Sequence, residues 1–220
     1  MQMAMAPISF IKTPFREKFG IPRQPLLVPE AIGRMEFPKT DFFVEAFRGI
    51  ENFTHLWLIF SFHEAVFEGA KALVRPPRFE GIEKWGVYAT RSPHRPNHLG
   101  LSAVKFGKIE ILESKIILEV CGVDLLDGTP ILDIKPYLPY TDRIQEAQAG
   151  VFLAAPELKK VIWSVDFFGE EKELIEKIIA LDPRPRTDDR SEFGVSIAGF
   201  NVRFRAFENE FEILKITAEK

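Results

Sequence analysis

The sequence predicts a mainly β protein, with a β-barrel or β-sandwich first and a small α+β unit after it. Short apolar segments, some with alternating polarity, recur along the chain and are separated by prolines and glycines. Only two segments, residues 42–50 and 170–180, have apolar residues at helical spacing. Short strands with few helices between them favour a closed or layered β structure over βαβ repeats. The composition changes after Asp142, which indicates a second unit.

The first part of the chain is expected to alternate strands with one long irregular loop. Ile8 to Thr13 is predicted to be a strand, and the three prolines between Pro14 and Pro25 prevent regular structure in the loop that follows. Leu26 to Ile32 is predicted to begin the next strand, and Phe42 to Ile50 a short helix. The continuous apolar segment from His55 to Phe62 predicts a strand buried on both faces.

The middle of the chain is predicted to complete the larger unit. Gly86 to Ala89 is expected to be a short strand that leads into a proline-rich loop. Ser102 to Leu112 and Lys115 to Val120 predict a β-hairpin around Glu113 and Ser114, because their apolar residues alternate with other residues. Ile131 to Ile134 predicts a short strand. We place the first domain at residues 1–146.

The second domain is placed at residues 147–220, with a linker from Ala147 to Pro156. A strand is predicted around Val161 to Phe167, followed by an amphipathic helix from Glu170 to Ala180. A loop from Asp182 to Asp189 comes next. Val195 to Phe207 and Phe211 to Thr217 then predict a hairpin.

Composition limits the class of protein. The chain has 220 residues, a formal net charge of −3 and a single cysteine, Cys121, so an internal disulfide is excluded. No apolar run approaches the ~20 residues that span a bilayer, and the N-terminus lacks the basic region of a signal peptide. We therefore expect a cytoplasmic protein with no membrane partner.

Basic residues are gathered in three groups although the net charge is negative. A local basic face is enough for RNA binding, but arginines scattered over a surface would give the same sequence pattern. The groups are Lys12, Arg16, Lys18 and Arg23; Arg75, Arg78, Arg91 and Arg95; and Arg184, Arg186, Arg190, Arg203 and Arg205.

The loop from Arg91 to Ser102 has the highest density of polar and ionisable side chains in the sequence. Two prolines three residues apart stiffen it, and Gly100 permits a turn or a close backbone approach. It carries two guanidinium groups, two imidazoles, an amide and two hydroxyls. Either it positions a ligand, or it is a surface loop whose arginine and asparagine side chains satisfy backbone groups.

Two long motifs resemble a known family. The run from Arg91 to Ser102 (RSxxRPNxxGxS) and the run from Asp124 to Tyr137 (DLLDGTPILDIKPY) resemble the signature pair of the TsaA-like (YaeB) family. Characterised members of that family are S-adenosylmethionine-dependent tRNA methyltransferases, called methyltransferase O. Further matches are PRQP at 22–25, FTHLW at 53–57, RPPR at 75–78 and DPRP at 182–185. The resemblance implies a small closed β-barrel for the N-terminal domain and a homodimer.

The resemblance also implies a site for S-adenosyl-L-methionine. A buried carboxylate can oppose the cationic groups of this cofactor, an arginine can bind its carboxylate end, and apolar side chains can wall the ring. The family pattern commonly has glycine after PRQP, whereas this chain has Leu26. The implied cofactor-binding residues are Pro25, Leu26, Leu27, His63, Glu64, Arg91, Leu101, Cys121, Gly122, Val123 and Asp124.

The implied substrate is tRNA carrying N6-threonylcarbamoyladenosine at position 37, next to the anticodon, and the implied reaction is methylation of N6. That nitrogen is a poor nucleophile, so a general base would help. The implied catalytic residues are Asp133, Lys135 and Tyr137, of which Asp133 and Lys135 share one strand face. Without the motif, an ion pair at the barrel rim explains the first two. The implied substrate-binding residues are Arg95, Asn97, Arg184 and Arg186.

Other functions have less support in the sequence. No GxGxxG, GxxxxGK[ST], HExxH or GxSxG pattern is present. His94 and His98 lie beside prolines at positions that the family motif leaves open, so we expect no metal site. The main alternative is a non-catalytic RNA- or nucleotide-binding module that uses the same basic loops. A hydrolase ranks last, because no triad or dyad spacing is found.

Overall fold

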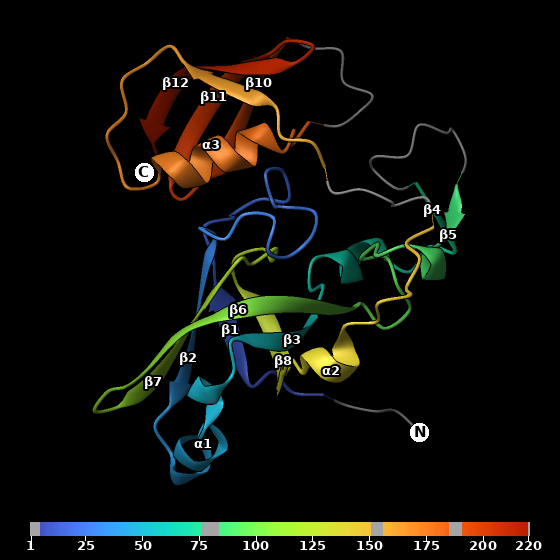
Figure 1. Cartoon of the computed structure of the whole chain (residues 1–220), viewed down its shortest axis with the longest axis vertical. Helices are drawn as coiled ribbons and strands as arrows, with labels where there is room; N and C mark the ends of the chain where they lie inside the picture. The colour runs from blue at the N-terminus through green and yellow to red at the C-terminus, as the bar shows by residue number, and fades with distance from the viewer. Residues whose placement is uncertain (1–4, 76–83, 151–155, 185–190, 220) are drawn as a thin grey trace.

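A computed structural model describes residues 5–75, 84–150, 156–184 and 191–219, and it confirms the mainly β fold with a closed barrel (Figure 1). Six strands close the barrel in the order β1-β2-β7-β6-β3-β8, and each neighbouring pair is antiparallel. Closure leaves no exposed sheet edge. The strands are β1 (Ser9–Lys12), β2 (Ile32–Pro38), β3 (His55–Ser61), β6 (Leu99–Ile111), β7 (Lys115–Cys121) and β8 (Thr129–Pro136).

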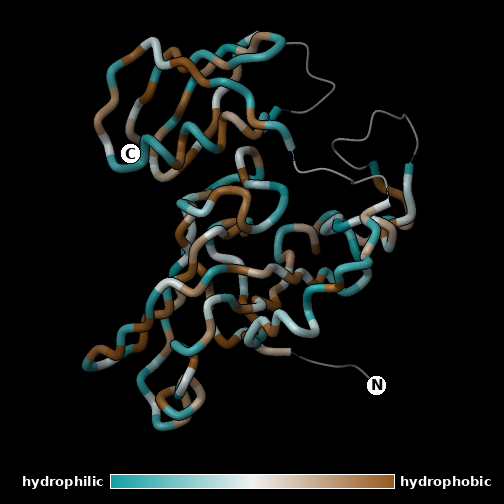
Figure 2. The backbone as a smooth tube through the Cα atoms, in the orientation of Figure 1, coloured by the Kyte–Doolittle hydropathy of each residue, from teal (hydrophilic) through white to brown (hydrophobic). Residues whose placement is uncertain are grey.

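The barrel interior is filled by every second residue of its strands. In β3, Leu56, Leu58 and Phe60 are buried, and β2 and β7 alternate in the same way. Hydrophobic and hydrophilic residues accordingly alternate along these strands (Figure 2). The prediction that β3 is buried on both faces is wrong, because His55, Trp57 and Ile59 are only half-buried on the outside of the barrel.

Short elements join the barrel strands. The helix α1 begins after Thr40, whose hydroxyl accepts a hydrogen bond from the Phe43 N–H at 3.3 Å, as an N-cap does. Gly86 to Ala89 was predicted to be a strand, but most of it is a 3-10 helix. The elements are α1 (Asp41–Ala46), η1 (Ile50–Asn52), η2 (Ala65–Glu68), β4 (Leu73–Val74), β5 (Trp85–Gly86), η3 (Val87–Ala89) and α2 (Pro139–Asp142).

The C-terminal part is a four-stranded sheet with one helix packed on it (Figure 1). The strand order is β10-β11-β12-β9, and β9 runs parallel to β12. The segment predicted as one strand from Val195 to Phe207 is two strands, because Ala198 and Gly199 form a tight turn with φ of 52° and 81°. The elements are β9 (Lys160–Trp163), α3 (Lys172–Ala180), β10 (Glu192–Ile197), β11 (Phe200–Ala206) and β12 (Glu210–Ala218). Residues 151–155 of the predicted linker and 185–189 of the predicted loop lie outside the described residues.

The long connection between β1 and β2, residues 13–31, touches both parts of the molecule. We call it the β1–β2 loop. Its Pro14 carbonyl accepts a hydrogen bond from the Ala198 N–H at 2.8 Å, and the Glu17 carboxylate accepts one from the Ser196 N–H at 2.8 Å. At Gly20, a Cβ would lie 2.5 Å from a methyl group of Val195, so the loop packs directly on β10. The strand predicted from Leu26 begins only at Ile32, since Leu26 has a left-handed φ of 64°.

Candidate active site

A half-buried carboxylate, that of Asp124, lies at the end of the barrel, just after β7. Asp124 accepts a hydrogen bond at 2.7 Å from the hydroxyl of Ser102, a buried residue of β6. Burial raises the pKa of Asp124 to about 6, although the Ser102 hydrogen bond and the Arg91 charge lower it. At neutral pH the group is therefore mostly ionised, with its charge only partly compensated. Such a carboxylate can receive a cationic ligand.

Arg91 lies close enough to Asp124 to affect its pKa. Its guanidinium is exposed and donates a hydrogen bond to the amide oxygen of Gln24, in the PRQP segment of the β1–β2 loop. The two predicted ligand loops therefore meet beside Asp124. Sequence reasoning singled out neither Gln24 nor the Ser102 hydroxyl as a site residue, although both lie inside the motifs that carry the family resemblance.

Leu26 and Gly122 form the other wall of this barrel end. The Leu26 N–H donates to the Gly122 carbonyl at 2.9 Å. Gly122 has φ of 77°, and a Cβ there would lie 2.7 Å from the Leu26 side chain and 3.0 Å from its Cα. Only glycine fits this approach without a shift. Leu26 is 38% exposed, so its side chain is available to a ligand at the barrel end.

The remaining predicted cofactor residues lie in different environments. Val123 is only 1% exposed, so its side chain belongs to the core and only its backbone can reach a ligand. Leu101 is 55% exposed and faces outward from β6. Pro25, Leu27 and Cys121 are half-buried near the Leu26–Gly122 contact. Burial raises the pKa of the Cys121 thiol, which makes it a poor nucleophile at neutral pH.

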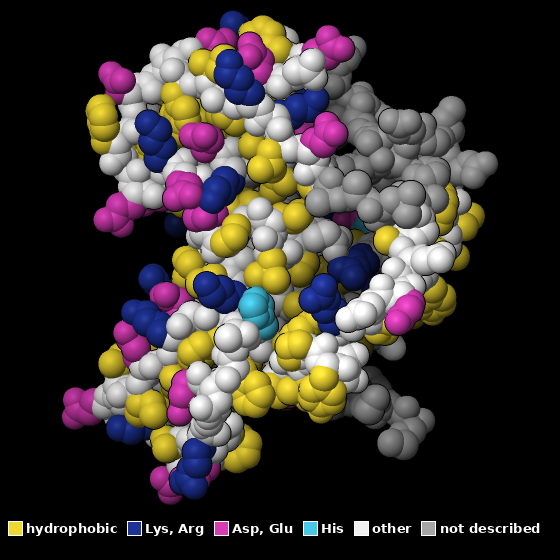
Figure 3. All heavy atoms as spheres, viewed as in Figure 1, with side chains coloured by type: hydrophobic (Ala, Val, Ile, Leu, Met, Phe, Trp, Pro, Cys, Tyr) yellow, Lys and Arg dark blue, Asp and Glu magenta, His cyan; other side chains and the backbone are white. Residues whose placement is uncertain are grey.

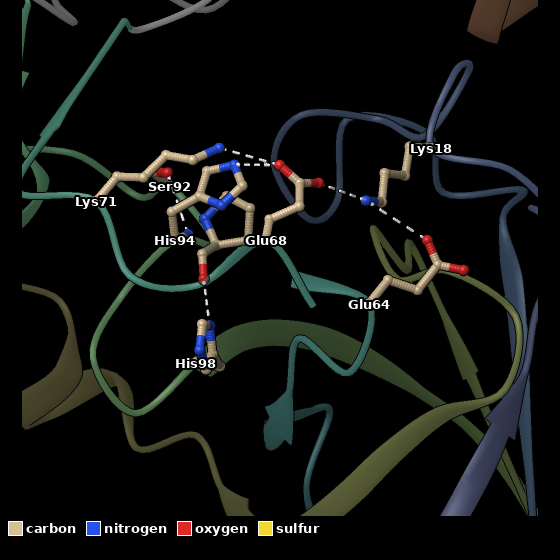
Figure 4. A network of polar contacts seen from close by, with 8 residues as sticks. Lys18, Glu64, Glu68, Lys71, Ser92, His94 and His98 are labelled. Carbon is tan, nitrogen blue, oxygen red and sulfur yellow. Dashed lines mark hydrogen bonds and ion pairs between the residues drawn. The ribbon is translucent and has the colours of Figure 1, made fainter. Parts of the chain in front are cut away.

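A polar network ties three loops together beside this end of the barrel (Figure 4). Glu68 of η2 lies 3.1 Å from the ammonium of Lys18, 3.0 Å from that of Lys71 and 3.6 Å from the imidazole of His94. The two lysines lower the pKa of Glu68 to about 2. Glu64, a predicted cofactor residue, joins through Lys18 at 3.6 Å. No motif in the sequence pointed to this network.

His63 stands next to Glu64 at the end of β3, where it is half-buried. Its backbone N–H donates to the Ser61 carbonyl at 2.8 Å, which turns the chain out of the strand. The same turn is held by a hydrogen bond from the Phe62 N–H to the His98 carbonyl at 2.8 Å. His63 and Glu64 therefore border the loop that carries Arg91.

The predicted catalytic residues lie on the outer face of the barrel. Asp133 pairs with Ile59 and Lys135 with Trp57, which confirms that the two share one face. They form no ion pair with each other among the described residues, so the alternative of a barrel-rim ion pair does not hold. Asp133 accepts a hydrogen bond from the Ile134 N–H at 2.9 Å, and the Tyr137 ring lies 5.4 Å from that of Trp57.

The predicted substrate-binding residues are used in different ways. Arg95 donates to the carbonyls of Val87 and Thr90 at 3.1 and 2.9 Å, so it also satisfies backbone groups of its own loop. Asn97 is exposed in a turn. Arg184 makes two hydrogen bonds to Asp182, at 2.7 and 2.9 Å, and lies over the Phe211 ring at 5.0 Å. Arg186 lies outside the described residues.

Within the described ranges, no three His, Cys, Asp or Glu side chains are grouped so that they could hold a metal ion. The same part of the chain contains no helix that is long and apolar enough to span a membrane.

The barrel and the attached sheet define a class of protein with solved members. The chain matches the crystal structure of TrmO from Pseudomonas aeruginosa with a TM-score of 0.79, at 35% identity over 99% of each chain. Another TrmO crystal structure gives a TM-score of 0.80 at 36% identity, over 99% of this chain and 100% of the other.

Sequence comparison identifies the family. Residues 10–143 match the tRNA-methyltransferase O N-terminal domain and residues 156–219 the TrmO C-terminal domain. The chain therefore belongs to the tRNA-methyltransferase O family, as the motif resemblance predicted. A relative from Escherichia coli, named tRNA (adenine(37)-N6)-methyltransferase, is 37% identical over 95% of both chains. One from Eikenella corrodens with the same name is 42% identical over 70% of this chain and 91% of its own length.

Proposed function

We propose that this protein is an S-adenosylmethionine-dependent tRNA methyltransferase that methylates N6 of threonylcarbamoyladenosine at position 37. The name of the Escherichia coli relative, which matches 95% of the chain, supports the tRNA substrate and the position. A Pseudomonas aeruginosa relative at 40% identity, RcsF, is assigned as S-adenosylmethionine-dependent. The observation that carries the proposal is the half-buried, partly compensated carboxylate of Asp124 beside Arg91.

The residues at the barrel end fit this cofactor. S-adenosylmethionine supplies an electrophilic methyl group when bound, and it has a sulfonium, an ammonium and a carboxylate. Asp124 opposes one of the cationic groups, which lowers the cost of its own burial. Arg91 binds the carboxylate end through its exposed guanidinium. The Leu26 side chain forms an apolar wall against the Gly122 backbone, while the Val123 side chain stays in the core.

The proton of the target nitrogen goes to a residue on the outer face. In our proposal the Asp133 carboxylate accepts it, since Asp133 has no ion-pair partner in the described structure and can act as a base. The Lys135 ammonium binds the carboxylate that the threonylcarbamoyl group adds to the base. Asp133 lies two residues nearer than Lys135 to the end of β3 that carries His63, because it pairs with Ile59 rather than Trp57.

Three further assignments are part of the proposal. The chain is divided into a cofactor-binding and catalytic domain at 1–146 and a tRNA-contacting domain at 147–220. The family resemblance supports a homodimer. The tRNA substrate supports a cytoplasmic location.

The test is a methyl-incorporation assay with labelled cofactor and two tRNAs that differ only in the threonylcarbamoyl group. We expect label on the modified tRNA and none on the unmodified one. A pocket built to pair the extra carboxylate and carbonyl leaves its polar groups unsatisfied without them, which costs up to ~10⁴–10⁵ in rate. Equal labelling would overturn the substrate. Absence of label from both, with RNA still bound, would favour the non-catalytic binding module.

A further inference from the structure

A row of aromatic rings lies on the outside of the barrel, on β3 and just after β8. The Trp57 ring is 5.4 Å from the Tyr137 ring, which is 6.3 Å from the His55 ring. All three residues are half-buried, so one side of the row is available to a ligand. Together with the outward residues Lys105 on β6 and Lys135 on β8, we call this surface the aromatic strip.

The rings of the aromatic strip are held in place. The Trp57 indole N–H donates to the Asp142 carboxylate at 2.8 Å, and the Leu138 N–H donates to the same oxygen at 2.8 Å. The Tyr137 N–H donates to the His55 carbonyl at 3.0 Å. The family motifs contain Trp57 and Tyr137, but no sequence pattern indicated the bond from Trp57 to Asp142. A fixed pair of rings costs little entropy when a flat partner stacks on it.

The strip also carries two lysines that form no ion pair in the described part of the chain. Lys105 lies opposite His55 and Lys135 opposite Trp57 on the neighbouring strands. Neither lysine has an ion-pair partner among the described residues. Two acids lie nearby: Asp133, which pairs with Ile59, and Asp142, whose carboxylate is held by Trp57 and Leu138. Half-buried rings that are tilted to one another by 45° and 61° and flanked by two lysines suit an unpaired, anionic polynucleotide, because a base can stack on a single ring and phosphates pair with ammonium groups.

We propose that the aromatic strip binds unpaired anticodon-loop nucleotides next to the target base, stacked on Trp57 and Tyr137 with a phosphate near Lys105, while Lys135 holds the carboxylate of the target base. This inference rests on the proposed function and deepens it. Trp57 lies four residues from Ser61 at the cofactor end of β3, about 13 Å at ~3.3 Å per residue. That separation places the flanking nucleotides on the strip while the flipped target base reaches the cofactor end.

A second copy of this chain fits the strip less well. A two-fold contact places the same patch against itself, so it would bring four lysines together with four carboxylates, of which the two Asp142 groups are already held by Trp57 and Leu138. Charges buried without partners are costly. RNA supplies the anions that these lysines lack.

The test uses an RNA stem-loop with the anticodon-loop sequence and 2-aminopurine beside the target position. We expect its fluorescence to fall on binding to the wild type and to fall much less with Trp57→Leu. Stacking on an aromatic side chain contributes enough that Trp57→Leu should weaken RNA binding by roughly 5- to 100-fold. Cofactor affinity, measured by calorimetry on each variant, should stay unchanged and shows that the barrel is folded.

A charge change tests the strip without touching the ring contacts. We expect Lys105→Glu to weaken RNA binding at least ~10-fold and Lys105→Ala to reduce the slope of log affinity against log salt by about 0.7. The matched control is Lys39→Glu, at the opposite end of the barrel after β2, where the lysine also has no ion-pair partner among the described residues. Lys39→Glu should change RNA affinity by less than ~2-fold. The Debye length at ~0.1 M salt is ~10 Å, so a charge farther than that from the bound RNA is largely screened.

Wild-type RNA affinity and 2-aminopurine quenching in both Trp57→Leu and Lys105→Glu would overturn the inference. So would a dimer, seen by sedimentation, that dissociates in these variants while RNA binding persists, because the strip would then be a contact between copies. Both outcomes differ from a failure of the proposed function. That failure would be seen if the wild-type protein bound the stem-loop but did not methylate the modified tRNA.

Discussion

One outer patch of the barrel differs from the C-terminal sheet in how its charged residues are paired. On the sheet, Arg205 pairs with Glu192 at 2.7 Å and with Glu212 at 3.6 Å, and in the loop after α3 Arg184 pairs with Asp182. Elsewhere on the barrel Lys12 and Lys115 pair with Glu36, but Lys105 and Lys135 have no such partner among the described residues. Figure 3 shows positive and negative side chains intermixed over the C-terminal sheet and over one side of the barrel, and Lys, Arg and His side chains over the middle of the barrel.

This difference indicates which basic residues are available to bind a ligand, because availability depends on whether the side chain already has an ion-pair partner. A guanidinium that already pairs with carboxylates must break those contacts before it binds a phosphate. An ammonium without a partner gains a contact and loses only water. The described members of the third basic group, Arg184, Arg203 and Arg205, are therefore weaker candidates for RNA binding than the composition suggested, and Lys105 and Lys135 are stronger ones.

The largest effect is expected at the outer face of the barrel. Asp133→Asn should lower the single-turnover methylation rate by roughly 10²–10⁴, the usual contribution of a general base, and Lys135→Ala should lower it as well. Cofactor affinity should change little, because both partners belong to the substrate. Rapid-quench assays and calorimetry measure the two quantities. Normal turnover in both variants would remove these residues from the mechanism.

A smaller effect is expected at the barrel end. Arg91→Ala should weaken S-adenosylmethionine binding roughly 10- to 100-fold, since a charged hydrogen bond is lost. The matched control is Arg205→Ala, an arginine whose partners all lie in the C-terminal sheet, and it should leave cofactor affinity unchanged. Isothermal calorimetry measures the S-adenosylmethionine affinity of the two variants. Equal affinities in both would show that Arg91 does not contact the cofactor.

The next effect concerns pH and stability. The pKa of Asp124 is raised from 3.8 to about 6, so the folded protein binds this proton more tightly than the unfolded chain. Its contribution to stability is thus present below about pH 4 and is lost as pH rises through about 6. We expect Asp124→Asn to remove this dependence and to be more stable at pH 7 by up to about 3 kcal/mol.

Urea unfolding of both proteins at pH 4, 5, 6 and 7 measures the stability difference, and other carboxylates cancel because they are common to the two. If the free energy of unfolding depends on pH in the same way in both proteins, the Asp124 carboxyl has the same pKa in the folded and unfolded states.

The smallest effect is expected on the C-terminal sheet. Arg205→Gln should change tRNA affinity by less than ~2-fold and leave the salt slope the same, whereas Lys105→Gln should reduce the slope by about 0.7. Filter binding between low and moderate salt measures both variants. A larger loss with Arg205→Gln than with Lys105→Gln would reverse the comparison between the two regions.

Much of the fold could be predicted because strand periodicity is local. The hairpin around Glu113 and the helix α3 were found with small errors at their ends. The errors lie where tertiary contacts override the pattern. Leu26 to Ala31 looked like the start of a strand, but the hydrogen bond from Leu26 to Gly122 holds it in a loop. Ala198 is an unusual residue for a left-handed turn, so the division between β10 and β11 was missed.

The site could be predicted only as far as its motifs reach. Asp124 and Arg91 come from motif positions, and the structure brings them together. The orientation of each side chain depends on register, which the motif does not give. Val123 thus turned out to face the core. The contacts of Glu68 with Lys18 and Lys71 join segments that are far apart in the chain, and no spacing rule reveals them.

The β1–β2 loop has a consequence for how the molecule unfolds. Phe15 of this loop is fully buried in a core that includes residues of both the barrel and the C-terminal sheet. Lys177 of α3 also contacts Glu30 near the other end of the loop, at 2.5 Å. Neither part can melt without exposing apolar surface of the other, so heat denaturation should occur as a single cooperative transition. A ligand held at the barrel end then raises the melting temperature of the distant C-terminal sheet together with that of the barrel.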